Sequence, residues 1–270
     1  MNKQGKHDRR FRRAAVLGAG VMGSGIAAHL AGAGLDVLLL DIVPPDLAPA
    51  AATDKKARNR FAAGGVDRLR TSKPSLIFHQ RDLERIRVGN LEDDLAEAAK
   101  ADIVIEAVRE DLNVKQALFA KMEPLLGAQT VLASNTSGLP IGKLMAGRSA
   151  DMRRRFLVTH FFNPVRYMRL LELVSGEETD PEVLSQVAEF GETQLGKGIV
   201  YGKDTTNFVA NRIGIYGMMG LIAEALAAGF TVEEVDAIFG PPLGRPKSAV
   251  FRTADMVGLD TVIDVAQNCY

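Results

Sequence analysis

The chain has 270 residues, in which 33 lysines and arginines balance 33 aspartates and glutamates. A net charge of zero gives no global attraction for nucleic acid, so any binding of anions has to be local. No apolar run approaches the roughly 18 residues that a membrane-spanning helix needs. The single cysteine, Cys269, excludes an intrachain disulfide framework and disfavours a cysteine-rich zinc site. We therefore expect a cytoplasmic protein that has no membrane span and binds neither nucleic acid nor a metal ion.

The stretch 14–41, AAVLGAGVMGSGIAAHLAGAGLDVLLLD, predicts a strand, a tight turn, a helix and a second strand. Three glycines have G-x-G-x-x-G spacing in the turn: Gly18, Gly20 and Gly23. Such glycines permit the turn, the approach of a pyrophosphate and the packing of helix on strand. The helix that opens with Val21 and Met22 offers unpaired N–H groups and a positive dipole end to phosphates. The pattern predicts a dinucleotide site; the alternative is a purely structural glycine-rich turn.

Asp41 ends the second strand, about 20 residues after the glycines, where a carboxylate can accept hydrogen bonds from both ribose hydroxyls of an adenosine. The same negative charge would repel a 2′-phosphate. The sequence therefore predicts NAD rather than NADP as the cofactor.

The segment 55–87 is basic and helical in character. Its cations are Lys55, Lys56, Arg58, Arg60, Arg68, Arg70, Lys73, Arg81, Arg85 and Arg87. One interpretation is a solvated helical hairpin. The other is a local cationic surface that binds a polyanionic part of a substrate.

Strands and helices alternate up to residue 140. We expect strands at 87–89, 101–108 and 130–134, and helices at 91–100 and 113–126. This alternation predicts a parallel, doubly wound sheet, in which ligands bind beyond the carboxyl ends of the strands. The residues on that side are Glu106, Glu110, Ser134, Asn135, Thr136 and Ser137.

The rest of the chain changes character near Lys203. Before this point we expect strands at 156–162, 170–174 and 199–201 and a helix at 181–195; after it the sequence predicts helices alone. We therefore expect a basic tail over 1–13, a Rossmann-type domain over 14–202 with a helical insertion, and a smaller all-α domain over 203–270.

His160 and Glu172 stand on two successive predicted strands, which can bring them side by side. A carboxylate would fix the tautomer of the imidazole and raise its basicity, as a general base requires; the alternative is a structural histidine. Ser137 and Asn135 lie in a predicted turn, where such residues commonly bond local backbone. Asn211 could cap its helix, bind a ligand or face solvent.

Five motifs in this order closely resemble the L-3-hydroxyacyl-CoA dehydrogenase family: GAGVMGSGIA, VIEAVRED, ASNTS, HFFNP followed by LLELV, and KDTTNFVANR. The resemblance covers nearly the whole chain from about Arg13. It implies NAD-dependent oxidation of (S)-3-hydroxyacyl-CoA to 3-oxoacyl-CoA in fatty-acid β-oxidation.

The resemblance also implies roles for matching residues. His160 corresponds to the catalytic base and Glu172 to its orienting partner, while Ser137 and Asn211 correspond to groups that bind the substrate oxygens. Positions near the cofactor are Glu110, Lys115, Asn135, Ser137 and Asn163. The family binds the coenzyme A nucleotide near its basic insertion, which makes Arg70 and Lys73 candidates for that contact.

The sequence departs from the family at three places. Gly138 replaces a second serine, and Thr206-Asn207 replaces a Pro-Gly pair. The chain ends at Tyr270, where relatives continue, so we expect the front of a longer protein that is a homo-oligomer in its full-length form. Its stretches GRPKSA and NRIGIYGM also resemble bacterial chains in which this dehydrogenase precedes an enoyl-CoA hydratase unit.

Two other functions stay open. The L-gulonate 3-dehydrogenase and lambda-crystallin relatives share the HFFNP element but use no coenzyme A. A non-catalytic dinucleotide-binding protein is the second alternative, although such a protein needs none of His160, Glu172, Ser137 and Asn211.

Overall fold

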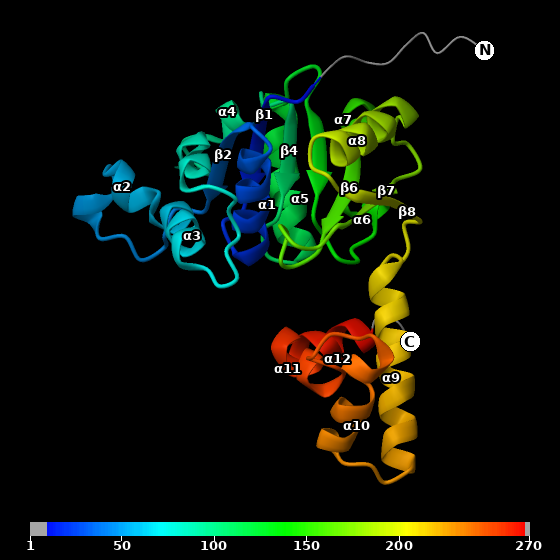
Figure 1. Ribbon diagram of the computed structural model, residues 1–270. Helices are drawn as coiled ribbons and strands as arrows, with labels where there is room; N and C mark the ends of the chain where they lie inside the picture. The colour runs from blue at the N-terminus through cyan, green and yellow to red at the C-terminus, as the bar shows by residue number, and fades with distance from the viewer. Residues whose placement is uncertain (1–9, 268–270) are drawn as a thin grey trace. The chain divides into compact units, whose positions relative to one another are not determined.

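The computed structural model describes residues 10–267, so Cys269 and residues 1–9 of the predicted tail lie outside the described residues. The chain divides into two compact units, Met1–Asp204 and Thr205–Tyr270 (Figure 1). Among the described residues, no helix combines the length and apolar character needed to cross a membrane. Within 10–267 there is also no group of three or more His, Cys, Asp or Glu side chains that could hold a metal ion.

The first unit is built on an eight-stranded sheet in the order β3-β2-β1-β4-β5-β6-β7-β8. The strands are β1 Arg13–Leu17, β2 Asp36–Asp41, β3 Ile86–Asn90, β4 Ile103–Glu106, β5 Val131–Ser134, β6 Phe156–Phe161, β7 Leu170–Ser175 and β8 Gly198–Gly202. All neighbouring strands are parallel except β6 and β7, which are antiparallel. This mostly parallel order confirms the predicted Rossmann-type sheet.

Helices cover both faces of this sheet. α1 Val21–Gly32, α3 Arg60–Thr71 and α8 Pro181–Thr193 share one core with strand residues such as Val16 and Leu157. Alternate side chains of a strand point to opposite faces, so Phe156 lies on the other face. There its ring meets Phe119 of α5 Leu112–Met122 edge to face, with ring centroids 5.4 Å apart. The remaining helical segments are α2 Lys55–Arg58, α4 Leu95–Ala98, α6 Ile141–Leu144, α7 Ala150–Arg154, η1 Pro49–Ala51, η2 Gln80–Arg85 and η3 Glu123–Leu125.

The predicted tail ends earlier than expected. Phe11 is buried and its ring packs edge to face on Phe190 of α8, with centroids 4.8 Å apart. The backbone N–H groups of Arg12 and Arg13 both donate to the Asp102 carboxylate at 2.9 Å. An aromatic side chain placed beside a strand start is drawn into the core, so the fold includes residues from Phe11 onward.

The helical hairpin considered for the basic segment is not formed in the described chain. After α3 the chain runs as a loop through 72–79 and then makes the 3₁₀ turn η2. Pro74 has no N–H to donate to a second helix, and the Ser72 hydroxyl accepts the N–H of Leu76 at 3.2 Å instead. The helix expected over 91–100 is likewise reduced to α4, because its first residues form a turn with side-chain to backbone bonds.

The second unit is helical throughout its described residues. It contains α9 Ala210–Ala227, α10 Val232–Ile238, η4 Pro241–Leu243, α11 Phe251–Val257 and α12 Leu259–Gln267. Ile215, Ala254 and Val262 form its buried core. α10 begins with a capping box, in which Thr231 and Glu234 each accept the backbone N–H of the other.

Candidate functional site

The glycine turn joins β1 to α1, and each of its glycines has a separate physical reason. Gly18 has a φ of 103°, and a Cβ on it would lie 2.5 Å from the Ala107 carbonyl oxygen. A Cβ on Gly23 would lie 1.8 Å from the carbonyl oxygen of Gly18, so only glycine lets helix and turn approach this closely. At Gly20, by contrast, nothing lies within 4 Å of a built Cβ. The open space at Gly20 is where a ligand can reach the backbone.

Asp41 lies directly beside this turn. One carboxylate oxygen accepts the N–H of Ala19 at 2.7 Å, and the other accepts the N–H of Ile42 at 2.7 Å. Each oxygen of an ionised carboxylate has two lone pairs, so each can still accept one hydroxyl hydrogen bond. The backbone therefore fixes the orientation of Asp41 and leaves it able to bind a diol.

A cavity of about 700 Å³ opens beside the turn. It is lined by Gly18, Gly20, Asp41, Ile42, Val43, Leu91, Glu92, Ala107, Val108, Arg109, Val114, Ala117, Leu118 and Lys121. Its apolar residues are suited to a flat heterocycle, and Asp41 supplies an acceptor for ribose hydroxyls. The cavity has the size and chemistry of a site for the adenosine half of a dinucleotide.

A buried ion network follows β4. Glu106 accepts hydrogen bonds from the Lys115 ammonium at 2.6 Å, from the Val108 N–H at 2.7 Å and from the Ser134 hydroxyl at 2.5 Å. Lys115 is 1% exposed and also lies 3.1 Å from a carboxylate oxygen of Glu110. Burial raises the pKa of Glu106 above its ordinary value, and the Lys115 ammonium opposes that rise. The buried carboxylate and ammonium are thus direct partners.

Lys115→Met is expected to lower the free energy of unfolding by about 3–5 kcal/mol, because it leaves the Glu106 carboxylate buried without a cation. Without Lys115 the raised pKa of Glu106 is unopposed, so the variant regains stability relative to wild type as pH falls and Glu106 takes up a proton. Urea denaturation between pH 5 and pH 8 measures both effects. Lys121→Met, on the exposed side of the same helix, is the control. An equal loss of unfolding free energy in Lys115→Met and Lys121→Met would contradict the stabilising role of the buried Lys115–Glu106 pair.

The loop after β5 is held by the same network. Glu110 accepts the Thr136 hydroxyl and the backbone N–H of Ser137, the latter at 2.9 Å. The Asn135 side-chain oxygen accepts the N–H of Phe161 at 2.9 Å, which ties this loop to the end of β6. Within residues 10–267 no protein partner is found for the Ser137 hydroxyl, which leaves it able to bind a ligand.

His160 and Glu172 form a buried pair on adjacent strands. The antiparallel register of β6 and β7 places them directly opposite, and Nδ1 of His160 lies 2.7 Å from Oε2 of Glu172. His160 is 4% exposed and Glu172 is 0% exposed. Because Nδ1 faces a carboxylate, it carries the hydrogen and Nε2 is the basic nitrogen. β6 runs parallel to β5, so this pair lies at the same edge of the sheet as the glycine turn.

Two further predicted site residues lie outside β6 and β7. Asn163 is exposed in the turn after β6, and Asn211 is half-buried on the first turn of α9 in the second unit. The Thr206-Asn207 departure is accommodated by Asn207, which has a φ of 61° and donates its amide to the Val265 carbonyl at 3.0 Å. Asparagine is among the few residues that tolerate this conformation, so it can stand where the family has glycine.

Several cations of the predicted cationic surface, the segment 55–87, are already paired with carboxylates of the protein. Ion pairs with carboxylates engage Arg58, Arg60, Arg70, Arg85 and Arg87. Arg70 lies 3.8 Å from Asp67, and Arg68 donates to the Ala19 carbonyl at 2.6 Å. Lys73 is exposed in the 72–79 loop and makes no ion pair within the described residues.

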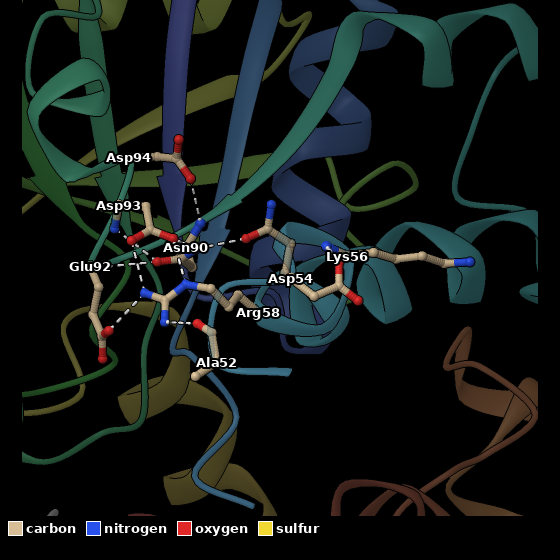
Figure 2. A network of polar contacts seen from close by, with 9 residues as sticks. Ala52, Asp54, Lys56, Arg58, Asn90, Glu92, Asp93 and Asp94 are labelled. Atoms are coloured by element: carbon tan, nitrogen blue, oxygen red, sulfur yellow. Dashed lines mark hydrogen bonds and ion pairs between the residues drawn. The ribbon is translucent and has the colours of Figure 1, made fainter. Parts of the chain in front are cut away.

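Sequence reasoning missed Glu92, which lines the cavity from the turn after β3. The sequence carried only part of the signal: it places Glu92 just after a predicted strand, but it does not show that this strand pairs with β2, whose last residue is Asp41. Figure 2 shows Glu92 in a network with Arg58, Asn90 and Asp93, in which Arg58 donates to both acidic side chains.

Two family models match this chain. The one described as the 3-hydroxyacyl-CoA dehydrogenase NAD binding domain matches residues 13–205, and the one described as the C-terminal domain of 3-hydroxyacyl-CoA dehydrogenase matches residues 208–270. Together they account for nearly all described residues.

A probable 3-hydroxyacyl-CoA dehydrogenase of Bacillus subtilis is 48% identical over 265 residues, which are 96% of this chain but only 34% of that protein. This chain therefore spans about a third of the length of that relative. A probable 3-hydroxyacyl-CoA dehydrogenase of Deinococcus radiodurans is 46% identical over 257 residues, which are 95% of this chain and 72% of that protein. Among solved structures, FadB2 of M. tuberculosis is similar with a TM-score of 0.78 at 33% identity, over 97% of this chain and 87% of that one.

Proposed function

Because this chain belongs to the 3-hydroxyacyl-CoA dehydrogenase family and carries its NAD-binding domain, we propose that it oxidises (S)-3-hydroxyacyl-CoA to 3-oxoacyl-CoA in fatty-acid β-oxidation. The observation that carries the proposal is the buried His160–Glu172 pair at the sheet edge that also bears the glycine turn. A protein that only bound a dinucleotide would need no such pair.

The residues present fit NAD. The open space at Gly20 admits a pyrophosphate to the backbone, and Asp41 keeps acceptor capacity for ribose hydroxyls. When bound, NAD supplies the acceptor for the hydride that leaves carbon 3 of the substrate.

His160 is the general base in this proposal, and its Nε2 removes the proton of the 3-hydroxyl. Glu172 holds Nδ1 and stabilises the imidazolium that forms, so the histidine presents one tautomer to the substrate. A positioned base of this kind contributes about 10²–10⁴-fold to the rate. The remaining acceleration comes from holding carbon 3 against the hydride acceptor.

Further contacts are part of the same proposal. Ser137 and Asn211 bind the substrate oxygens, and Glu110, Lys115, Asn135 and Asn163 surround the nicotinamide half. The hydrogen bonds between Glu110 and Ser137 and between Asn135 and Phe161 support this, because they connect the loops after β4 and β5 with each other and with the end of β6. Arg70 and Lys73 are the proposed contacts for the coenzyme A nucleotide.

We also propose a homo-oligomer and a cytoplasmic location. Large exposed apolar side chains support the first, because α9 alone exposes Ile213, Tyr216 and Leu226. The proposed location rests on the single cysteine, which suits a reducing compartment. The proposed fusion to an enoyl-CoA hydratase unit rests on the stretches GRPKSA and NRIGIYGM, and relatives at 36% identity that are named putative trifunctional enzymes of a fatty acid oxidation complex support it.

The test measures oxidation of NADH by this chain with acetoacetyl-CoA and, in parallel, with free acetoacetate. A third assay measures reduction of NAD with L-gulonate. The Deinococcus radiodurans relative serves as a reference for the assay. We expect turnover with the thioester only. Turnover of L-gulonate would replace the proposal by the gulonate reaction, and NADH binding without any turnover would favour a non-catalytic protein.

A further inference from the structure

In the cavity beside the glycine turn, the acidic and the basic side chains come from different parts of the sheet. Asp41 and Glu92 come from the ends of β2 and β3, while Arg109 and Lys121 come from the region after β4. The ends of β2 and β3 are neighbours: Asp41 is in register with Asn90, and the Leu91 N–H donates to the Asp41 carbonyl at 2.9 Å. The Glu92 turn therefore lies beside the residue that faces the ribose.

Arg58 contacts Glu92 on this acidic side, and four of its five N–H donors are already engaged. Nε and Nη2 donate to the two Asp93 carboxylate oxygens at 2.7 and 2.8 Å, and Nη2 also donates to Glu92 at 2.9 Å. Nη1 donates to the Ala52 carbonyl at 3.1 Å. All three guanidinium nitrogens thus have acceptors in the protein, as Figure 2 shows.

The turn that carries Glu92 is itself fixed. The Asn90 side-chain oxygen accepts the N–H groups of Glu92 and Asp93 at 3.0 and 2.9 Å, and its amide donates to Asp93 at 2.8 Å. Lys56, the other cation in this view, points away from the network (Figure 2). A group bound next to Asp41 would consequently meet carboxylates that are held in place, and an arginine with four of its five N–H donors already engaged.

We propose that Glu92 is a second determinant of the preference for NAD over NADP. Its carboxylate adds to the repulsion that Asp41 exerts on a 2′-phosphate, and together with Asp93 it keeps Arg58 from binding that phosphate. The proposal rests on the cofactor site of the proposed function and is independent of the acyl substrate.

The test compares Glu92→Gln and Glu92→Lys with wild type, by calorimetric titration with NADH and NADPH. In a well-hydrated site, repulsion between one carboxylate and a phosphate of charge near −2 weakens binding of that phosphate about five- to tenfold. We therefore expect the Kd of NADPH to fall about five- to tenfold in Glu92→Gln and further in Glu92→Lys. The Kd of NADH is expected to change less than about threefold, because NADH has no charge at the 2′ position.

Glu97→Gln is the matched control. Glu97 also pairs with an arginine, Arg87, and its side chain is 59% exposed against 63% for Glu92, but it does not line this cavity. The gain in NADPH binding should shrink in 0.5 M salt, since screening weakens a charge effect and leaves a purely structural one unchanged. Equal changes for both cofactors, or the same change in Glu97→Gln, would overturn the proposal.

The outcomes also separate this inference from the proposed function. NADH binding without turnover of acyl-CoA would contradict the proposed reaction and leave the specificity comparison intact. Failure of every variant, including wild type, to bind NADH would overturn the dinucleotide site and the role of Glu92 together.

Discussion

His160→Ala is expected to lower kcat at least about 100-fold while the Kd of NADH changes less than about threefold. The His160 side chain carries the basic nitrogen and lies on β6, whereas the cavity beside the glycine turn is lined by residues at or after the carboxyl ends of β1, β2, β3 and β4 and by α5. Loss of the imidazole therefore removes the base without touching the adenosine site. Steady-state assay with acetoacetyl-CoA and titration with NADH measure the two quantities.

Two further variants show whether a loss of rate reflects chemistry or folding. His160→Asn keeps an N–H near the position of Nδ1, so Glu172 retains a donor although the base is gone; its kcat should fall as in the alanine variant. Thr159→Val changes the adjacent buried residue, whose hydroxyl finds no partner among the described residues, and should leave kcat unchanged. A near-normal rate in His160→Asn would refute the role of this histidine.

The parts of the site that the sequence predicted depend on local spacing. The glycines lie within one turn, and their spacing alone fixes which of them must lack a Cβ. His160 and Glu172 lie on strands joined by a short connection, so their register follows from a hairpin-like return of the chain. In both cases residues close in sequence decide the geometry.

The parts that the sequence could not predict depend on residues far apart in the chain. The basic segment looked like a cationic surface because its acidic partners, such as Asp36 for Arg85 and Glu97 for Arg87, lie outside it. Phe11 looked like part of a tail because its partner, Phe190, is on α8. Glu92 was overlooked for the same reason, since only the pairing of β2 with β3 brings it beside Asp41.

Two alanine substitutions in the glycine turn, Gly20→Ala and Gly23→Ala, are expected to have different effects on stability although both lower the affinity for NADH. Gly20→Ala places a methyl group where no protein atom lies within 4 Å, on a backbone with a φ of −67° that any residue can adopt. Stability should therefore be unchanged or rise by about 0.4–1 kcal/mol through the unfolded chain. The methyl group instead occupies the approach of the pyrophosphate, and loss of one charge-assisted hydrogen bond raises the Kd of NADH about 10–100-fold.

Gly23→Ala is expected to lower both stability and NADH affinity. Its methyl group would lie 1.8 Å from the Gly18 carbonyl oxygen, a backbone atom that can move only if the turn or α1 shifts. Such overpacking costs about 1–3 kcal/mol or more and displaces the N–H groups that face the phosphates. Gly142→Ala on α6, also with open space around its built Cβ and outside the cavity, is the control for both measurements. Thermal unfolding measures stability, and titration with NADH measures affinity. Normal NADH affinity in Gly20→Ala would mean that the turn does not bind pyrophosphate. Normal stability in Gly23→Ala would mean that helix and turn are not in tight contact.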